Sequence, residues 1–242
     1  STFEGSFFGI VVSKSLGTEI DNNTFQGITN DGILLGSDVY DINIHHNRVF
    51  SWSGISQTIE AVRTPPDVRG AGYVHHNLAQ TISVPTGRDP APGSVREYAV
   101  ADYDNDGFAE NHIFGTHGWP PEAWNVYNNT LITKTSHSFG TAALALTPAS
   151  EVPWYFLNNI LVQNYPEGKL FREVRMDSQA LGQQIADGNI YWRAPRSDGT
   201  QSTAPLYFLF EYTDPLGAVK QVSFASIEEF RASPYFAMTQ GY

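Results

Sequence analysis

The sequence predicts an all-β fold, a right-handed parallel β-helix in which short strands stack coil upon coil. An asparagine recurs in one local setting, at Asn23, Asn47, Asn77, Asn129, Asn159 and Asn189. An apolar or small residue stands three positions before and two positions after each of them. The intervals are 24, 30, 52, 30 and 30 residues. A recurrence of roughly 20–50 residues indicates stacked structural repeats.

Each repeat is expected to contain two short strands joined by a sharp corner. In the segment IHHNRV, the two-residue alternation of a strand places Ile44 inside and His45 outside. Asn47 is expected at the corner, because asparagine tolerates the left-handed backbone conformation and hydrogen-bonds locally. Val49 then points back inside. Amide side chains stacked from coil to coil can bond along the axis.

A third strand is expected to open each following coil, at residues 9–12, 32–36 and 54–57. Together the coils are expected to cover about residues 8–193, as about six to eight turns of a single domain spanning residues 1–242. We expect the 52-residue interval before Asn129 to be one coil with a long insertion.

The repeat pattern ends near residue 195. Two apolar segments, PLYFLFEY and AVKQVSF, flank TDPLG and predict an antiparallel hairpin around residues 214–217. Beyond it, Ser226 precedes Glu228 and Glu229, and apolar residues recur at helical spacing. This pattern predicts one short helix within residues 223–236.

The segment GILLGSDVYDINIHHNRV (residues 32–49) closely resembles the parallel β-helix repeat of the pectate-lyase-like superfamily. The resemblance covers roughly residues 8–193. It implies the fold and leaves the activity open, because this superfamily includes lyases, hydrolases, epimerases, phage tailspikes and adhesins.

The first function that the resemblance implies is a polysaccharide lyase acting on an acidic, uronate-containing polysaccharide. The alternative is a non-catalytic glycan-binding or structural module of a cell-surface or phage-associated protein. Either function implies an extracellular, periplasmic or cell-surface location.

Composition narrows the classes of partner. The formal net charge of −11 argues against nucleic acid, whose phosphates reward Lys and Arg. The absence of an 18-residue apolar run argues against a membrane span. The coil pattern begins close to Ser1 without a polar cap, and the expected helix lies close to Tyr242. We therefore expect additional domains in a longer polypeptide or end-to-end self-association.

The strongest chemical motif is DYDNDGFAE (residues 102–110). Asp102, Asp104, Asp106 and Glu110, with the carbonyl of Phe108, can surround a hard cation with oxygen ligands. The pattern resembles the D-x-D-x-D-G calcium loop of unrelated β-proteins. It predicts a Ca²⁺ site with a structural role, and the alternative is a solvated acidic turn.

Two histidine pairs occupy the same repeat position, His45–His46 and His75–His76. His45 and His75 are candidate substrate-binding residues, because stacked imidazoles can bind a transition metal or exchange protons. The favoured alternative is that histidine replaces asparagine in a polar corner.

The resemblance also implies a basic residue that removes a proton from a uronate. The candidates lie on two inserted loops that are rich in Pro and Gly, and each is individually expected to be a surface charge: Arg63, Arg69, Arg88 and Arg96. His112 and His117 flank the acidic motif and are further candidates for catalysis.

Aromatic residues provide the last group of candidates. Trp119, in the Pro-rich segment HGWPPEAW, is the expected platform for a sugar ring. Trp124 and Trp154 share one repeat position, five residues before an asparagine, and are expected in the core.

Overall fold

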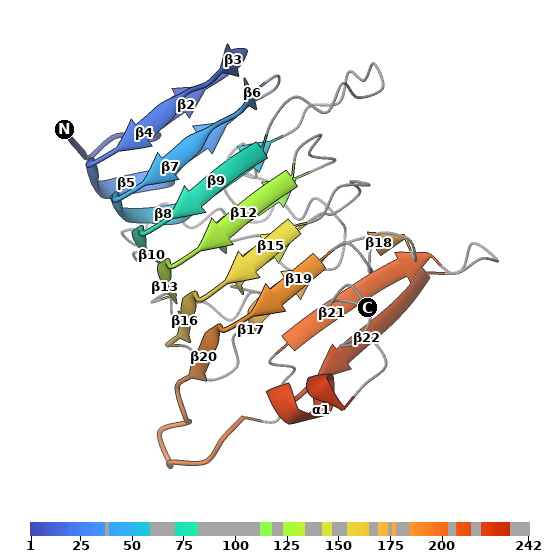
Figure 1. The fold of residues 1–242 in the computed structure, drawn as a ribbon. Coiled ribbons are helices and arrows are strands. Elements are labelled where there is room, and N and C mark those ends of the chain that lie inside the picture. Colours follow the sequence, from blue (N-terminus) through green and yellow to red (C-terminus); the bar gives the residue numbers. More distant parts are fainter. Residues whose placement is uncertain are drawn as a thin grey trace, which may run out of the picture.

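The computed structural model describes residues 1–36, 39–58, 71–81, 112–117, 123–133, 142–146, 154–164, 169–173, 176–177, 184–202, 207–213 and 219–232. These residues form an all-β fold with one short helix, α1 (Ile227–Arg231). Figure 1 shows the strands stacked one above another from the N-terminus to the C-terminus. Almost all pairings between strands are parallel, as expected for a solenoid.

One sheet has six parallel strands and contains the strand that precedes each repeated asparagine. Its strands, in spatial order, are β19 (Gln184–Asp187), β15 (Trp154–Leu157), β12 (Ala123–Tyr127), β9 (Ala71–His75), β7 (Asn43–His45) and β4 (Glu19–Asp21). The register aligns the repeats as the sequence predicts: Ile44 pairs with Ile20 on one side and with Val74 on the other.

The second sheet has eleven strands and follows each coil around the corner. Its strands are β1 (Thr2–Glu4), β2 (Ile10–Val12), β5 (Thr24–Leu35), β8 (Arg48–Thr58), β10 (Leu78–Thr81), β11 (His112–His117), β13 (Thr130–Thr133), β14 (Ala142–Leu146), β16 (Ile160–Gln163), β17 (Lys169–Glu173) and β20 (Ile190–Arg193). β5 and β8 are long and contain both the strand after the corner and the expected third strand. Beyond β8 the two parts separate into the series β10-β13-β16-β20 and β11-β14-β17.

Side-chain amides link the corners of successive coils. The Oδ1 atom of Asn129 accepts hydrogen bonds from the backbone N–H of Asn77 (3.0 Å) and from its Nδ2 (3.1 Å). The Nδ2 atom of Asn129 donates to the carbonyl of Val74, 2.8 Å away in the preceding coil, and to Oδ1 of Asn159. The same link joins all six repeated asparagines. Asn47, Asn77, Asn129 and Asn159 are buried with their polar atoms paired.

The left-handed corner residue is one position earlier than predicted. The repeated asparagines are not the residues with positive φ. That conformation belongs to the preceding residue in each coil: Asn22, His46, His76, Asn128, Asn158 and Gly188, with φ between 53° and 65°. The turn is made by this outward residue, which leaves the following asparagine free to point inward and bond along the axis. The prediction of an asparagine at the corner was correct, but its backbone conformation was wrong.

The interior is filled by apolar columns that run along the stack. One column contains Phe25, Val49, Ala79, Leu131 and Leu161, all essentially inaccessible to solvent. Trp124 is also fully buried, as predicted. It faces Gly72 of the preceding coil, where a Cβ atom would lie 2.5 Å from the indole ring. The indole therefore fits because its neighbour has no side chain.

The long interval between Asn77 and Asn129 is bridged by one coil, as predicted. β9 pairs directly with β12, and β10 pairs directly with β13. The C-terminal hairpin is also confirmed, because β21 (Tyr207–Thr213) and β22 (Val219–Phe224) are antiparallel. β21 also pairs with β18 (Met176–Asp177) and lies against β17. The remaining strands, β3 (Ser15–Leu16) and β6 (Val39–Tyr40), pair with each other.

The short helix begins where the sequence predicts. The hydroxyl of Ser226 accepts a hydrogen bond from the backbone N–H of Glu229 and caps α1. The carboxylate of Glu229 accepts a hydrogen bond from the backbone N–H of Ala225. Phe230 packs edge-on against Phe224 of β22, and these two contacts join the helix to the hairpin.

Replacing a central member of the amide series should test its contribution to stability. We expect Asn129→Leu to lower the free energy of unfolding by about 1–3 kcal/mol, because buried groups of Asn77 and Val74 lose their partners. Urea denaturation monitored by circular dichroism measures this change. Asn128→Gly is the matched control, because Gly188 occupies the equivalent exposed corner. Equal losses in the two variants would contradict the role given to the buried amide.

Candidate functional site

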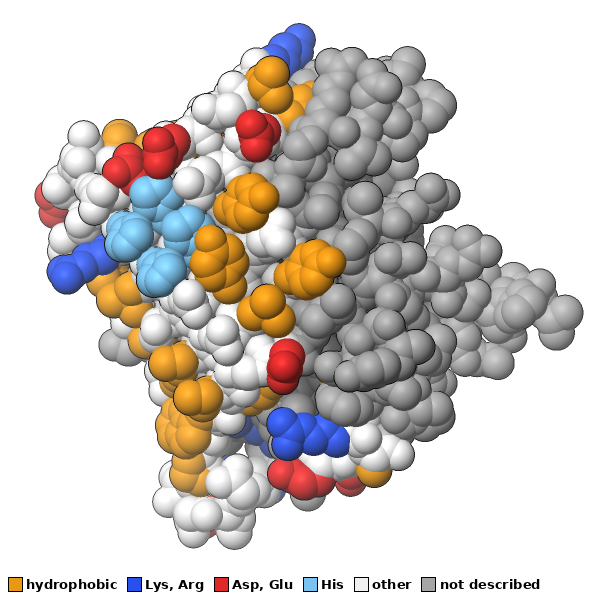
Figure 2. Space-filling model, in the orientation of Figure 1, with side chains coloured by type: hydrophobic (Ala, Val, Ile, Leu, Met, Phe, Trp, Pro, Cys, Tyr) orange, Lys and Arg blue, Asp and Glu red, His pale blue; other side chains and the backbone are white. Residues whose placement is uncertain are grey.

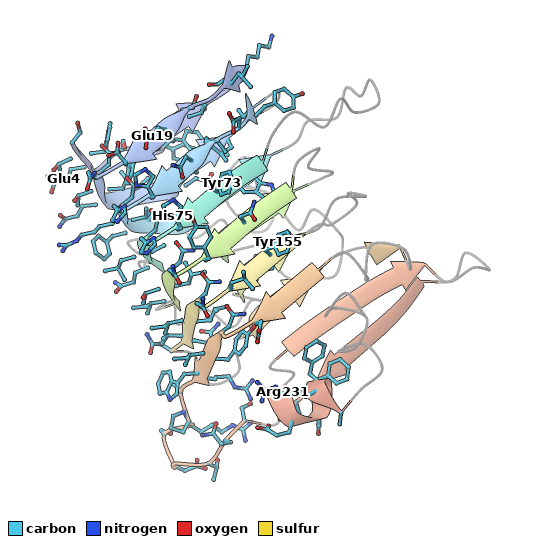
Figure 3. All side chains as sticks on the ribbon, in the orientation of Figure 1. Glu4, Glu19, Tyr73, His75, Tyr155 and Arg231 are labelled. Carbon is cyan, nitrogen blue, oxygen red and sulfur yellow. The ribbon has the colours of Figure 1, made fainter. Side chains whose placement is uncertain are left out.

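The outer face of the six-stranded sheet carries two columns of side chains between the corners and the far end of the strands. The first column is made by Glu19, Asn43, Tyr73, Asn125 and Tyr155. The second is made by Asp21, His45, His75, Tyr127, Leu157 and Asp187. Figure 3 shows Glu19, Tyr73 and Tyr155 along this face, with His75 beside them.

Four imidazoles form a block at the corner end of this face. The rings of His45 and His75 are stacked, with centroids 4.9 Å apart, and those of His46 and His76 are stacked at 5.2 Å. Tyr127 continues the inner stack, 4.8 Å from His75. In Figure 2 the block appears as one pale-blue group, next to acidic side chains on one side and apolar or aromatic side chains on the other. The spacing equals that of neighbouring strands, so the coil repeat itself stacks the rings.

Within each coil, the two histidines are joined by their Nδ1 atoms. The Nδ1–Nδ1 distance is 2.8 Å between His45 and His46 and 2.9 Å between His75 and His76. The ring centroids of these pairs are 5.0 and 5.1 Å apart, so the two Nδ1 atoms lie near the line between the ring centres and face each other. That arrangement is an N–H···N hydrogen bond, in which a single proton lies between the rings.

The outer partners of these pairs fix which nitrogen donates. Nε2 of His45 lies 2.7 Å from Oε1 of Glu19, an acceptor, so this nitrogen carries the hydrogen. With both rings neutral, Nδ1 of His45 then accepts from Nδ1–H of His46. The hydrogen bonds therefore form a chain from the carboxylate of Glu19 through His45 to His46, which we call a relay. Nε2 of His46 keeps its lone pair.

The next coil repeats the relay with an amide in place of the carboxylate. Nε2 of His75 donates to Oδ1 of Asn43 at 3.0 Å, and Nδ1 of His75 accepts from His76. Nε2 of His76 is an acceptor and lies 3.4 Å from the amide nitrogen of Asn128. Asn43 stands at the register position of Glu19, one coil further on.

His75 is the central ring of the block and titrates abnormally. Burial lowers the pKa of His75 from 6.5 to about 4, and charge repulsion from His45, His76 and His46 acts in the same direction. His75 is therefore neutral at physiological pH, which is compatible with its hydrogen bonds to Asn43 and His76. Burial also raises the pKa of Tyr127, with a further contribution from Tyr73, so the next ring in the stack is neutral as well.

The structure brings together the two histidine pairs that the sequence singled out. The candidate substrate-binding residues His45 and His75 are occupied by contacts within the block. His75 is covered on one ring face by His45 and on the other by Tyr127, so it offers no face to a sugar. His45 is paired with Glu19. The accessible ring nitrogens belong to His46 and His76, in the exposed corner column where histidine replaces asparagine.

The other predicted site residues lie either in the second sheet or outside the described residues. His112 and His117 are the first and last residues of β11, which lies in the eleven-stranded sheet. The remaining candidates lie outside the described residues: Arg63, Arg69, Arg88, Arg96, Asp102, Asp104, Asp106, Phe108, Glu110 and Trp119. The lyase hypothesis and the calcium site remain predictions.

Sequence reasoning missed Glu19, Asn43 and the tyrosines of the first column. Tyr73 and Tyr155 lie four residues before a repeated asparagine, as does Glu19. This column contains Glu, Asn and Tyr without an obvious pattern, so residue type gave no signal. A search for outward positions at fixed distance from each asparagine would have found it.

Comparison of the chain with family models, with curated proteins and with solved structures gave no match. The fold therefore rests on the repeat and on the strand register. In the part of the chain that the structure describes, no helix has the length and apolar character needed to cross a membrane.

The low pKa of His75 makes stability depend on pH. The unfolded chain takes up a proton near pH 6.5, whereas the folded chain resists it until about pH 4. Stability should therefore fall as the pH is lowered through this window. His75→Tyr removes the titrating group and keeps a stacked ring like that of Tyr127. Melting temperatures in EDTA should fall more steeply for the natural chain, by on the order of a few degrees. Parallel curves for the two proteins would contradict this.

Proposed function

We propose that the chain is a carbohydrate-active protein, a single-domain right-handed parallel β-helix of the pectate-lyase-like superfamily with about six to eight coils, and that it binds a glycan along the outer face of the six-stranded sheet. Parallel strands that follow one another through successive coils support the β-helix, and right-handed crossovers are the rule for such connections. A location outside the cytoplasm belongs to the same proposal.

The observation that carries the proposal is the chemistry of this face. Across five neighbouring strands it presents amides, phenols and imidazoles, which combine hydrogen-bonding atoms with flat apolar rings. Tyr73 is 38% exposed, although it is a large aromatic residue. Tyrosine and tryptophan with one accessible side are typical of recognition surfaces.

The spacing of the two tyrosines suits an elongated ligand. Tyr73 and Tyr155 belong to the same column and are separated by Asn125, so two strand spacings of about 4.8 Å separate them. The amide of Asn125 lies between them and can hydrogen-bond a hydroxyl group. A sugar chain lying along the stack would meet an aromatic ring, an amide and a second aromatic ring in succession.

The charges of the face favour an uncharged glycan. The described outward residues of the six-stranded sheet include Glu19, Asp21 and Asp187 and contain no Lys or Arg. A uronate polymer would need cations from elsewhere, and the resemblance assigns that role to the arginines of the inserted loops. We keep elimination from a uronate polymer, the lyase activity, as the second part of the proposal, supported by the resemblance alone.

A polysaccharide panel with two readouts tests both parts. Calorimetry with neutral polysaccharides should show binding that weakens at least about tenfold in Tyr73→Ala and Tyr155→Ala, because aromatic anchors with an accessible side carry much of such affinity. Trp192→Ala is the matched control, since this aromatic is 47% exposed on β20 of the other sheet. Equal loss in all three variants, or no binding to any member, would overturn the binding face.

The same panel, extended to pectin, alginate and glycosaminoglycans, detects elimination as unsaturated products that absorb in the ultraviolet. Products that disappear on replacing Arg63, Arg69, Arg88 or Arg96 by Ala would support the lyase. Glycan binding without products would leave the non-catalytic module as the function.

The calcium site predicted from the acidic motif is part of the proposal and has its own test. Ca²⁺ should raise the melting temperature, because a ligand that binds only the folded state stabilises it. Asp104→Asn and Asp106→Asn should remove this increase and leave the melting temperature in EDTA unchanged. The same melting temperature with and without Ca²⁺ would remove the site.

A further inference from the structure

We propose that His46 and His76 form a binding site for a borderline-soft divalent metal ion, for which Zn²⁺ is the probe. The two residues occupy equivalent corners in successive coils, with φ of 55° and 54°. Both side chains are exposed, and their rings are parallel to within 4°. This site uses none of the residues of the acidic motif, and it does not depend on the proposed glycan binding.

The first argument is the state of the outward nitrogens. In each relay the shared proton lies between the two Nδ1 atoms, so Nε2 of the outer ring carries a lone pair. The lone pair of His76 faces the amide nitrogen of Asn128 at 3.4 Å, a long contact that a metal ion would replace. A metal-binding histidine almost always donates its other ring N–H to a fixed acceptor, which orients the ring and selects the tautomer. His46 and His76 donate in this way to His45 and His75, which are themselves fixed by Glu19 and Asn43.

The second argument is that the Nδ1 atoms of the four histidines cannot form an alternative metal site. The paired Nδ1 atoms face each other and share one proton, so they do not offer two lone pairs that converge on a third point. Among the described residues, no group of three or more His, Asp or Glu side chains is arranged to hold a metal ion. The proposed site therefore has two protein ligands, and water or another molecule completes the coordination.

The third argument concerns the distance between the Nε2 atoms of His46 and His76. A Zn–N bond is about 2.0–2.1 Å, so the two Nε2 atoms must approach one another more closely than the 5.2 Å spacing of the ring centroids. The rings must tilt toward each other, and exposed side chains reorient readily. The inner rings, His45 and His75, are held by Glu19 and Asn43 and need not move.

The charge around the block also favours a cation. Glu19 and Asp21 lie on its N-terminal side, and the formal charge of the chain is −11. Arg48, two residues after His46, opposes this attraction in part. Imidazole ligands suit zinc, copper and nickel, whereas calcium prefers oxygen, so the site differs in specificity from the acidic motif.

Calorimetry with ZnCl₂ on the chelator-treated protein tests the proposal. The natural chain should bind one Zn²⁺ at this site, and His46→Asn with His76→Asn should weaken that binding at least about tenfold. Asparagine is the appropriate substitute because it occupies the same left-handed corner at Asn128 and Asn158. His112→Asn is the control for loss of a histidine from the eleven-stranded sheet, and it should leave the affinity unchanged.

A gain-of-function variant makes the test independent of any folding defect. Asn128→His places a third imidazole in the same corner column, directly after His76. It should tighten Zn²⁺ binding about tenfold or more, because a further ligand enters the coordination shell. Absence of Zn²⁺ binding to the natural chain, the same affinity in the double variant, or no gain in Asn128→His would overturn the proposal. Glycan binding measured in EDTA is unaffected by any of these outcomes.

Discussion

The repeated asparagines hold the coils in register, and the other features of the structure depend on this contact. Each buried amide satisfies polar groups in its own coil and in both neighbouring coils. A backbone corner without such a partner would bury an N–H or a carbonyl at a cost of about 1–3 kcal/mol. Asn129, with contacts to Asn77, Val74 and Asn159, shows the full set. The apolar columns stabilise the interior, but they do not by themselves prevent one coil from sliding against the next.

The corner also explains why the histidine block lies where it does. The residue before each asparagine must adopt a left-handed conformation and point outward, so it contributes little to the core. Four coils fill this position with Asn or Gly, and two fill it with His46 and His76. Because the strand spacing brings like residues to about 4.8 Å, two substitutions in adjacent coils suffice to place imidazoles in contact. Glu19 and Asn43 then decide the direction of each hydrogen bond.

Much of the fold was predictable because the structural repeat produces a regular sequence pattern. Ile44, Val49 and Asn47 have the same neighbours in every coil, so inward positions and corner positions followed from spacing alone. The conformation of the corner did not, because asparagine is suited both to the left-handed turn and to the hydrogen-bonding position beside it. Only the structure distinguishes Asn22, which has the left-handed conformation, from Asn23, which bonds to the next coil.

The site was predictable in part for a related reason. The histidine pairs stood out because identical residues recurred, and their shared position indicated stacking. Their partners could not be inferred, since Glu19 and Asn43 differ in type and come from the preceding coils. Whether a ring offers its face or its edge also depends on what lies above and below it. Tyr127 covers His75 and turns a candidate sugar contact into part of a stack.

The hydrogen bonds between successive asparagines have nearly the same length whatever the number of residues between them, which bears on insertions and deletions in the chain. The backbone N–H of Asn77 lies 3.0 Å from Oδ1 of Asn129 across an interval of 52 residues, and Asn47 lies 3.0 Å from Asn77 across 30. The length of the chain between two corners therefore does not enter the geometry of the corners. Segments between coils can be lengthened, shortened or exchanged while the side chains of the six-stranded sheet keep their places. The repeated corners form a constant geometric frame within this chain, and the segments between coils can change without altering that frame.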